Sequence, residues 1–117
     1  MGLRSLLREV ATPLKEFDLT GKTAIVIGGG RGIGKSIALT LAEAGADIMV
    51  AARTSKEIEQ TASEIKDLGR KGIAVSADAT KATDIGNVVA TATSEWGRID
   101  ILVNSAGVVL GFSHFDY

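Results

Sequence analysis

The sequence predicts an α/β fold, a doubly wound parallel sheet with helices on both of its faces. Two features of the pattern predict it. Short apolar segments alternate with longer segments of helical periodicity from residue 23 onward, and strands and helices that alternate in this way form parallel sheets. The apolar segments are hydrophobic at nearly every position, as strands are when both faces of their sheet are covered. We expect about four strands, in the order 3-2-1-4 along the sheet.

The first strand, the first helix and the second strand follow one another closely. Thr23–Ile27 is a short run rich in β-branched residues, which favour strands. Ile33–Ala44 has helical spacing, and Gly45 is expected to end this helix. Asp47–Ala51 is the next apolar run and predicts the second strand. The predicted buried stripe of the helix consists of Ile33, Ile37, Leu41 and Ala44.

A second helix and a third strand come next. The helix is predicted over Ser55–Leu68, and Gly69 is its expected C-terminal stop. Thr54 and Glu57 have the spacing of a capping box, in which each side chain bonds the backbone N–H of the other residue. Ile73–Ser76 predicts the third strand. The predicted buried stripe of the helix consists of Ile58, Ala62, Ile65 and Leu68.

A third helix and a fourth strand complete the pattern. Helical spacing extends over Thr83–Trp96, and Gly97 follows as its stop. Ile99–Val103 is apolar and predicts the fourth strand. The residues predicted to face inward from the helix are Ile85, Val88, Val89, Ala92 and Trp96.

Composition limits the classes of function. The chain has 117 residues, enough for one domain, and a net charge of −1, which gives no reason to expect nucleic acid or a membrane as a partner. It has no Cys and one His, which excludes disulfides and Cys-based or multi-His metal sites. No apolar run approaches the ~20 residues of a membrane span, and a cytoplasmic location is expected. Residues 1–19 are expected to form an N-terminal extension with a short amphipathic helix over residues 3–11, and residues 20–117 to form the domain.

The segment over residues 27–34, Ile-Gly-Gly-Gly-Arg-Gly-Ile-Gly, lies between the first strand and the first helix. Glycines here let the backbone turn sharply, approach a pyrophosphate and pack the helix closely on the sheet. The N-terminus of the helix then offers unpaired N–H groups and a positive dipole end to the phosphates. The pattern Gly-x-x-x-Gly-x-Gly fits Gly28, Gly32 and Gly34, whereas Gly-x-Gly-x-x-Gly fails because residue 33 is Ile. The segment therefore predicts a Rossmann-type dinucleotide site.

On this motif the sequence resembles the short-chain dehydrogenase/reductase family, and two later motifs are similar as well. Asp78 follows the third strand, where the family places an Asp against the adenine ring, and residues 104–107 (Asn-Ser-Ala-Gly) resemble the family's Asn-Asn-Ala-Gly. Ile27 stands where the family has Thr, and Ser105 where it has the second Asn. The resemblance covers residues 20–107 and implies the N-terminal, cofactor-binding half of such an enzyme. The residues expected to bind the cofactor are Gly28, Gly30, Arg31, Gly32, Ile33, Gly34, Arg53, Thr54, Asp78, Ala79, Asn104, Ala106 and Gly107.

Charged residues favour NADP(H) over NAD(H). An acid at the end of the second strand, about 20 residues after the glycines, would bind the ribose hydroxyls and repel a 2′-phosphate. This sequence has Arg53 there instead, and Asp47 lies at the wrong end of the strand to replace the acid. The guanidinium groups of Arg31 and Arg53 can bind a phosphate through charge-assisted hydrogen bonds, and the hydroxyl of Thr54 or Ser55 can add another.

The resemblance implies an NADP(H)-dependent oxidoreductase that transfers hydride between nicotinamide and a carbonyl or alcohol substrate. The family's catalytic Ser and Tyr-x-x-x-Lys come after the fourth-strand motif. Here Tyr117 is the only Tyr and the last residue, so no catalytic residue is assigned, and this chain alone is expected to be inactive. The substrate is expected to bind only in a longer form. Ser113, His114 and Asp116 lie too close together in sequence to be a catalytic triad, and no metal site is expected.

Two other functions stay open. One is a dinucleotide-binding module without chemistry of its own. The other is a methyltransferase-like domain, which Arg53 disfavours because that class needs an acid at the end of the second strand. The strand Ile99–Val103 is expected to be an open, apolar sheet edge, and the residues after Gly107 a loop or tail. The family's dimerisation helices are not expected in this sequence, so no oligomeric state is predicted.

Overall fold

The computed structural model describes residues 18–105 and 111–113, so the helix predicted over residues 3–11 lies outside the described residues. Strands and helices alternate as predicted, and a short strand follows them. The elements are β1 (Thr23–Ile27), α2 (Gly32–Glu43), β2 (Asp47–Ala52), α3 (Ser55–Asp67), β3 (Gly72–Ser76), α4 (Ala82–Trp96), β4 (Ile101–Asn104) and β5 (Gly111–Ser113).

The strands form one sheet in the order β3-β2-β1-β4-β5. The pairs β1–β2, β1–β4 and β2–β3 are parallel, which confirms the predicted fold class and the order 3-2-1-4. β1 therefore lies between its two neighbours, and its carboxyl end is flanked by the ends of β2 and β4. A crevice at such a position, where the strand order reverses, is where open α/β sheets bind ligands.

The prediction that β4 is an open edge was wrong for its C-terminal part. Gly111–Ser113 pairs with it in antiparallel register, from Leu102 opposite Ser113 to Asn104 opposite Gly111. This pairing satisfies backbone N–H and C=O groups that an edge strand would leave unpaired. The expected loop or tail after Gly107 is likewise wrong at residues 111–113, while His114, Asp116 and Tyr117 lie outside the described residues.

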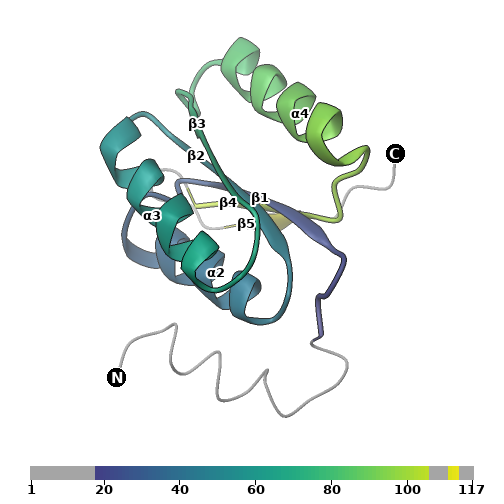
Figure 1. The fold of residues 1–117 in the computed structure, drawn as a ribbon. Coiled ribbons are helices and arrows are strands. Elements are labelled where there is room, and N and C mark those ends of the chain that lie inside the picture. The colour runs from purple at the N-terminus through teal and green to yellow at the C-terminus, as the bar shows by residue number, and fades with distance from the viewer. Residues whose placement is uncertain (1–17, 106–110, 114–117) are drawn as a thin grey trace.

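The sheet is covered on both faces. Figure 1 shows α2 and α3 on one face and α4 on the other. Side chains alternate along β1, so that Ala24 and Val26 pack toward α2 and α3 while Ile25 and Ile27 pack toward α4. Each face holds its own apolar cluster, as expected for strands that are apolar at nearly every position. The described helices include none that is long and apolar enough to cross a membrane.

The helices depart from the predicted buried stripes at their ends. Ile33 was expected to be buried, but it is 52% exposed, because it lies in the first turn of α2 beyond the end of the sheet. Leu41 and Ala44 are partly exposed. Leu68, expected to be buried on α3, is 39% exposed at the position that caps that helix. The buried residues of α2 are Gly34, Ile37, Ala38, Leu39 and Ala42.

The capping box predicted at the start of α3 is also absent. Thr54 is the N-cap residue, but its side chain makes no capping hydrogen bond. The backbone carbonyl of Thr54 instead accepts hydrogen bonds from the N–H groups of Glu57 (3.1 Å) and Ile58 (3.3 Å). The side chain of Glu57 lies near Gly30 of the β1–α2 turn, so it is not available to close the box.

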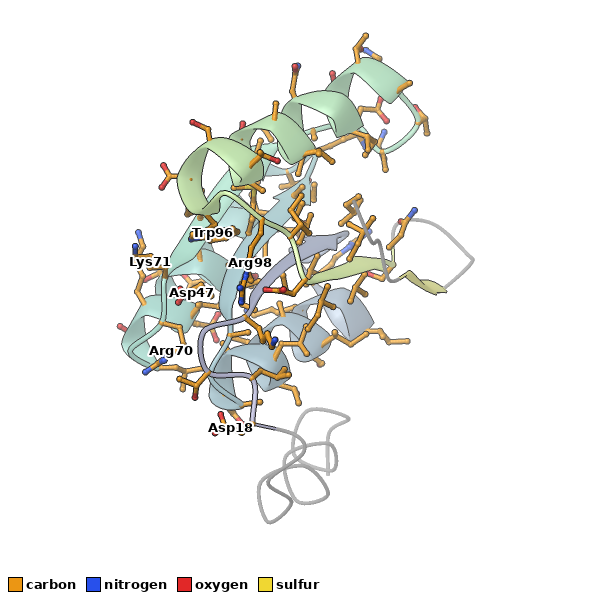
Figure 2. All side chains as sticks on the ribbon, turned by 90° about the vertical axis from the view of Figure 1, so that its right-hand side faces the viewer. Asp18, Asp47, Arg70, Lys71, Trp96 and Arg98 are labelled. Atoms are coloured by element: carbon orange, nitrogen blue, oxygen red, sulfur yellow. The ribbon has the colours of Figure 1, made fainter. Side chains whose placement is uncertain are left out.

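Polar side chains fix the opposite, amino-terminal end of the sheet. The N–H of Thr23 donates to Oδ2 of Asp100 (2.9 Å), and the N–H of Lys71 donates to Oδ1 of Asp47 (2.9 Å). Arg98 Nη2 donates to the carbonyl of Gly21 (2.8 Å), and Figure 2 shows Arg98 near the beginning of β1. These bonds join segments where strands begin, and the carboxyl ends of the parallel strands are left for the glycine turn.

Candidate functional site

The turn between β1 and α2 has a backbone that only glycines adopt easily. Gly28 has a φ of 84° and Gly32 a φ of 59°, both in the left-handed region. Gly34 is needed for a different reason, because a Cβ there would collide with the carbonyl oxygen of Gly28 and the hydroxyl of Ser105. The three glycines of the predicted motif therefore let the chain turn twice and bring α2 close against the ends of β1 and β4.

Hydrogen bonds hold this turn to both neighbouring strands. The N–H of Gly28 donates to the carbonyl of Ala51 on β2 (2.7 Å). On the other side, the N–H of Ser105 donates to the carbonyl of Ile27 (2.9 Å), and the hydroxyl of Ser105 donates to the same carbonyl (3.0 Å). A longer contact of 3.4 Å joins that hydroxyl to the carbonyl of Gly28. The start of the turn is thus fixed between β2 and β4.

The N-terminus of α2 is left without a protein cap. Its N-cap residue is Arg31, whose side chain has no hydrogen-bond acceptor, and no capping bond from a side chain is formed. The first turn of α2 contains no acid, whereas α3 has Glu57 and α4 has Asp84 at the corresponding turn. An uncapped helix N-terminus has unpaired N–H groups and a positive dipole end, which are suited to an anion.

A cavity of about 500 Å³ opens at this end of the sheet. The glycine turn forms one side of it, and the other sides are formed by the end of β2, the residues that follow β2, β3 and β4, and the start of α3. Arg31 and Arg53, which are distant in sequence, both line it and are both exposed. The lining residues are Ile27, Gly28, Gly30, Arg31, Gly32, Ile33, Gly34, Ala52, Arg53, Thr54, Glu57, Ala77, Ala79 and Ser105.

The remaining predicted site residues do not line the cavity or are not described. Asn104 is exposed at the end of β4, and Ala106 and Gly107 lie outside the described residues. Asp78 follows β3, but its carboxylate is engaged in a local turn, where Oδ1 accepts hydrogen bonds from the hydroxyl (2.7 Å) and the N–H (2.9 Å) of Thr80. These bonds lower the pKa of Asp78 below its ordinary value, and the bond from the hydroxyl contributes more than the bond from the N–H. The structure thus gives Asp78 a role in shaping the loop after β3.

Sequence reasoning missed several lining residues. Ser105 was noted only as a departure from a motif, yet its hydroxyl fixes the glycine turn. Glu57 was assigned to a helix cap, yet it lines the cavity with the two arginines. The signal for Glu57 was its position in the first turn of α3, because helices that follow parallel strands begin at the carboxyl edge of the sheet.

Among the residues that the structure describes, there is no group of three or more His, Cys, Asp or Glu that could hold a metal ion.

A family profile and several curated proteins match most of this chain by sequence. Residues 22–116 match the profile of the family described as short chain dehydrogenase. The chain is 40% identical over 94 residues to an uncharacterized oxidoreductase of Mycobacterium tuberculosis, with 80% of this chain and 36% of the relative covered. It is 42% identical over 107 residues to a short-chain dehydrogenase/reductase of Pestalotiopsis microspora, with 91% and 40% covered. The chain therefore spans about two fifths of the length of these curated relatives.

Solved structures have the same arrangement of strands and helices. A hydroxysteroid dehydrogenase from Escherichia coli matches with a TM-score of 0.76 at 39% identity, over 79% of this chain and 39% of that one. A short-chain type dehydrogenase/reductase from Mycobacterium marinum matches with a TM-score of 0.75 at 43% identity, over 80% and 38%.

Proposed function

The chain belongs to the short-chain dehydrogenase family, and from this premise we propose that it is the NADP(H)-binding half of an oxidoreductase. One observation carries the proposal: the uncapped N-terminus of α2 opens into the same cavity that Arg31 and Arg53 line. The cavity thus combines a helix end suited to a pyrophosphate with two guanidinium groups suited to a further phosphate.

The residues present fit a dinucleotide. Gly34 lacks the Cβ that would collide with Gly28 and Ser105, so α2 can lie close to the sheet, and its N-terminus begins directly at the cavity. Backbone N–H groups at the start of α2 would hold the pyrophosphate, and Arg31, Arg53 and Thr54 would hold the 2′-phosphate of NADP(H). When bound, the nicotinamide group supplies or accepts a hydride. The substrate would be a carbonyl compound or an alcohol bound by the whole protein.

The chain's own contribution to the chemistry is binding and orientation. The hydrogen bonds of Gly28 and Ser105 fix the turn before a ligand arrives, which lowers the entropy lost on binding. The sequence has a single Tyr, Tyr117, and no Tyr-x-x-x-Lys, so we propose no acid or base within it. The alternative is a dinucleotide-binding module without chemistry of its own. The cytoplasmic location stays a prediction.

A binding titration tests the proposal. The purified chain is titrated with NADPH and with NADH, and binding is followed by the fluorescence of the reduced nicotinamide. We expect saturable binding of both, with the lower dissociation constant for NADPH. A chain that is folded by circular dichroism and binds neither dinucleotide would contradict the proposal. If the purified chain reduced a carbonyl compound with NADPH and no other protein present, the proposal that it contains no catalytic acid or base would be contradicted.

A further inference from the structure

Glu57 is an unexpected charge in the cavity. The charged residues that line it in the described part of the chain are Arg31, Arg53 and Glu57, so Glu57 is the acid among them. A Cβ placed on Gly30 would lie 3.0 Å from the Cβ of Glu57 and 3.4 Å from its Oε1. The carboxylate therefore lies against the glycine turn, at the side of the cavity formed by the start of α3.

The carboxylate of Glu57 has no hydrogen-bond or ion-pair partner in the described part of the chain, residues 18–105 and 111–113. It does not cap α3. The neighbouring acid Glu64, by contrast, is paired with Lys35 at 2.6 Å across α2 and α3. A carboxylate in the first turn of a helix is favoured by the helix dipole. At the start of α3 the carboxylate of Glu57 therefore partly neutralises the positive end of the helix dipole that would otherwise attract an anionic ligand.

From this position we infer that Glu57 is a specificity-determining residue that limits the preference for NADP(H) over NAD(H). The inference rests on the proposed function. A 2′-phosphate carries about two negative charges, and a carboxylate that lines the same cavity repels it. A ribose 2′-hydroxyl is neutral and can donate a hydrogen bond to the carboxylate. Glu57 thus counteracts the attraction of the two arginines for the 2′-phosphate. It reduces the difference between the dissociation constants of the two cofactors.

The test is the ratio of two dissociation constants, measured by titration of the full chain with NADPH and NADH. Glu57→Gln removes the charge and keeps the shape of the side chain. We expect it to lower the dissociation constant for NADPH about threefold, the size of one partly screened charge pair, and to leave that for NADH equal or higher. Glu57→Asp keeps the charge and should retain a ratio near that of the wild type.

Glu59→Gln is the matched control. Glu59 is exposed on the same helix, two residues after Glu57, and does not line the cavity. Its substitution by Gln changes the net charge of the chain as much as Glu57→Gln does. The ratio of the two dissociation constants in Glu59→Gln should equal that of the wild type. An unchanged ratio in Glu57→Gln, or an equal change in Glu59→Gln, would overturn the inference and leave the proposed function intact. Failure of the folded wild-type chain to bind either dinucleotide would overturn the proposed function and the inference with it.

Discussion

The hydroxyl of Ser105 donates a hydrogen bond of 3.0 Å to the carbonyl of Ile27, across the boundary between β4 and β1. The two residues are 78 positions apart in sequence. The bond fixes the last residue of β1, from which the glycine turn departs, to the segment that follows β4. The geometry of the candidate site therefore depends on a contact that exists only after the parallel sheet has formed.

Ser105→Ala should lower the free energy of unfolding by about 1 kcal/mol, because it removes one hydrogen bond from a partly buried hydroxyl. The backbone bond from Ser105 to Ile27 remains, so the variant should still fold. Urea unfolding followed by circular dichroism measures the change. Ser94→Ala, at an exposed position of α4, is the control and should shift the free energy by less than about 0.5 kcal/mol. Equal effects of the two substitutions would show that the hydroxyl of Ser105 is not engaged as described.

Gly34→Ala should destabilise the protein and abolish dinucleotide binding. Alanine in a helix is favoured over glycine by roughly 1 kcal/mol, but here its Cβ meets the carbonyl of Gly28 and the hydroxyl of Ser105. Overpacking of this kind costs about 1–3 kcal/mol, and since neither contact can move without disturbing the turn, we expect a net loss of stability. Urea unfolding and the NADPH titration together measure both effects.

Gly86→Ala provides the matched comparison. Gly86 lies within α4, and a Cβ there would meet nothing within 4 Å. The substitution should raise the free energy of unfolding by about 0.5–1 kcal/mol and leave binding unchanged. If Gly34→Ala stabilised the chain as Gly86→Ala does, the close approach of α2 to the turn would be refuted.

The parts of the fold that local patterns encode could be predicted from the sequence. The β-branched run at Thr23–Ile27 and the stops at Gly45 and Gly97 lie where expected, since strand propensity and left-handed glycines are properties of short segments. The order of the sheet followed from the alternation of strands and helices, because crossover connections leave few topologies.

The parts that could not be predicted depend on tertiary contacts. Ile33 fits a helical stripe, yet it lies beyond the end of the sheet and has no core to face. Glu57 matches a capping pattern with Thr54, yet its side chain lies against a turn that is distant in sequence. The strand Gly111–Ser113 has no strong pattern and forms by pairing with β4. In each case the outcome depends on which parts of the folded chain lie beside the residue, and the local sequence does not encode this.

Thr80→Val should raise the pKa of Asp78 toward its ordinary value of 3.8. In the wild type, hydrogen bonds from the hydroxyl and the N–H of Thr80 favour the charged carboxylate and lower its pKa. A carboxyl whose pKa is lowered by folding contributes stability above its unfolded pKa, and this stability is lost as the pH falls through the folded pKa. The variant, which keeps only the backbone bond, should therefore lose less stability than the wild type on acidification from about pH 5 to about pH 2.

Carbon NMR titration of the Asp78 carboxyl group measures the pKa directly. Thr83→Val is the control, since Thr83 is exposed at the start of α4 and makes no hydrogen bond to Asp78 within the described chain. It should leave the titration of Asp78 unaltered. A pKa in Thr80→Val that equals the wild-type value would mean that the hydroxyl of Thr80 does not hold the carboxylate.

Arg53→Ala should weaken the binding of NADPH by about 1–3 kcal/mol and leave that of NADH nearly unchanged. Arg53 lines the cavity with an exposed side chain, so its truncation removes a charge without opening the core. The loss should shrink as salt is added, because exposed charges are screened within about 10 Å at 0.1 M ionic strength. Arg70→Ala removes the same charge from the opposite end of the sheet, where Arg70 contacts the carbonyl of Gly45, and should not alter the preference between the cofactors. Equal losses for NADPH and NADH in Arg53→Ala would refute the assignment of this guanidinium to the 2′-phosphate.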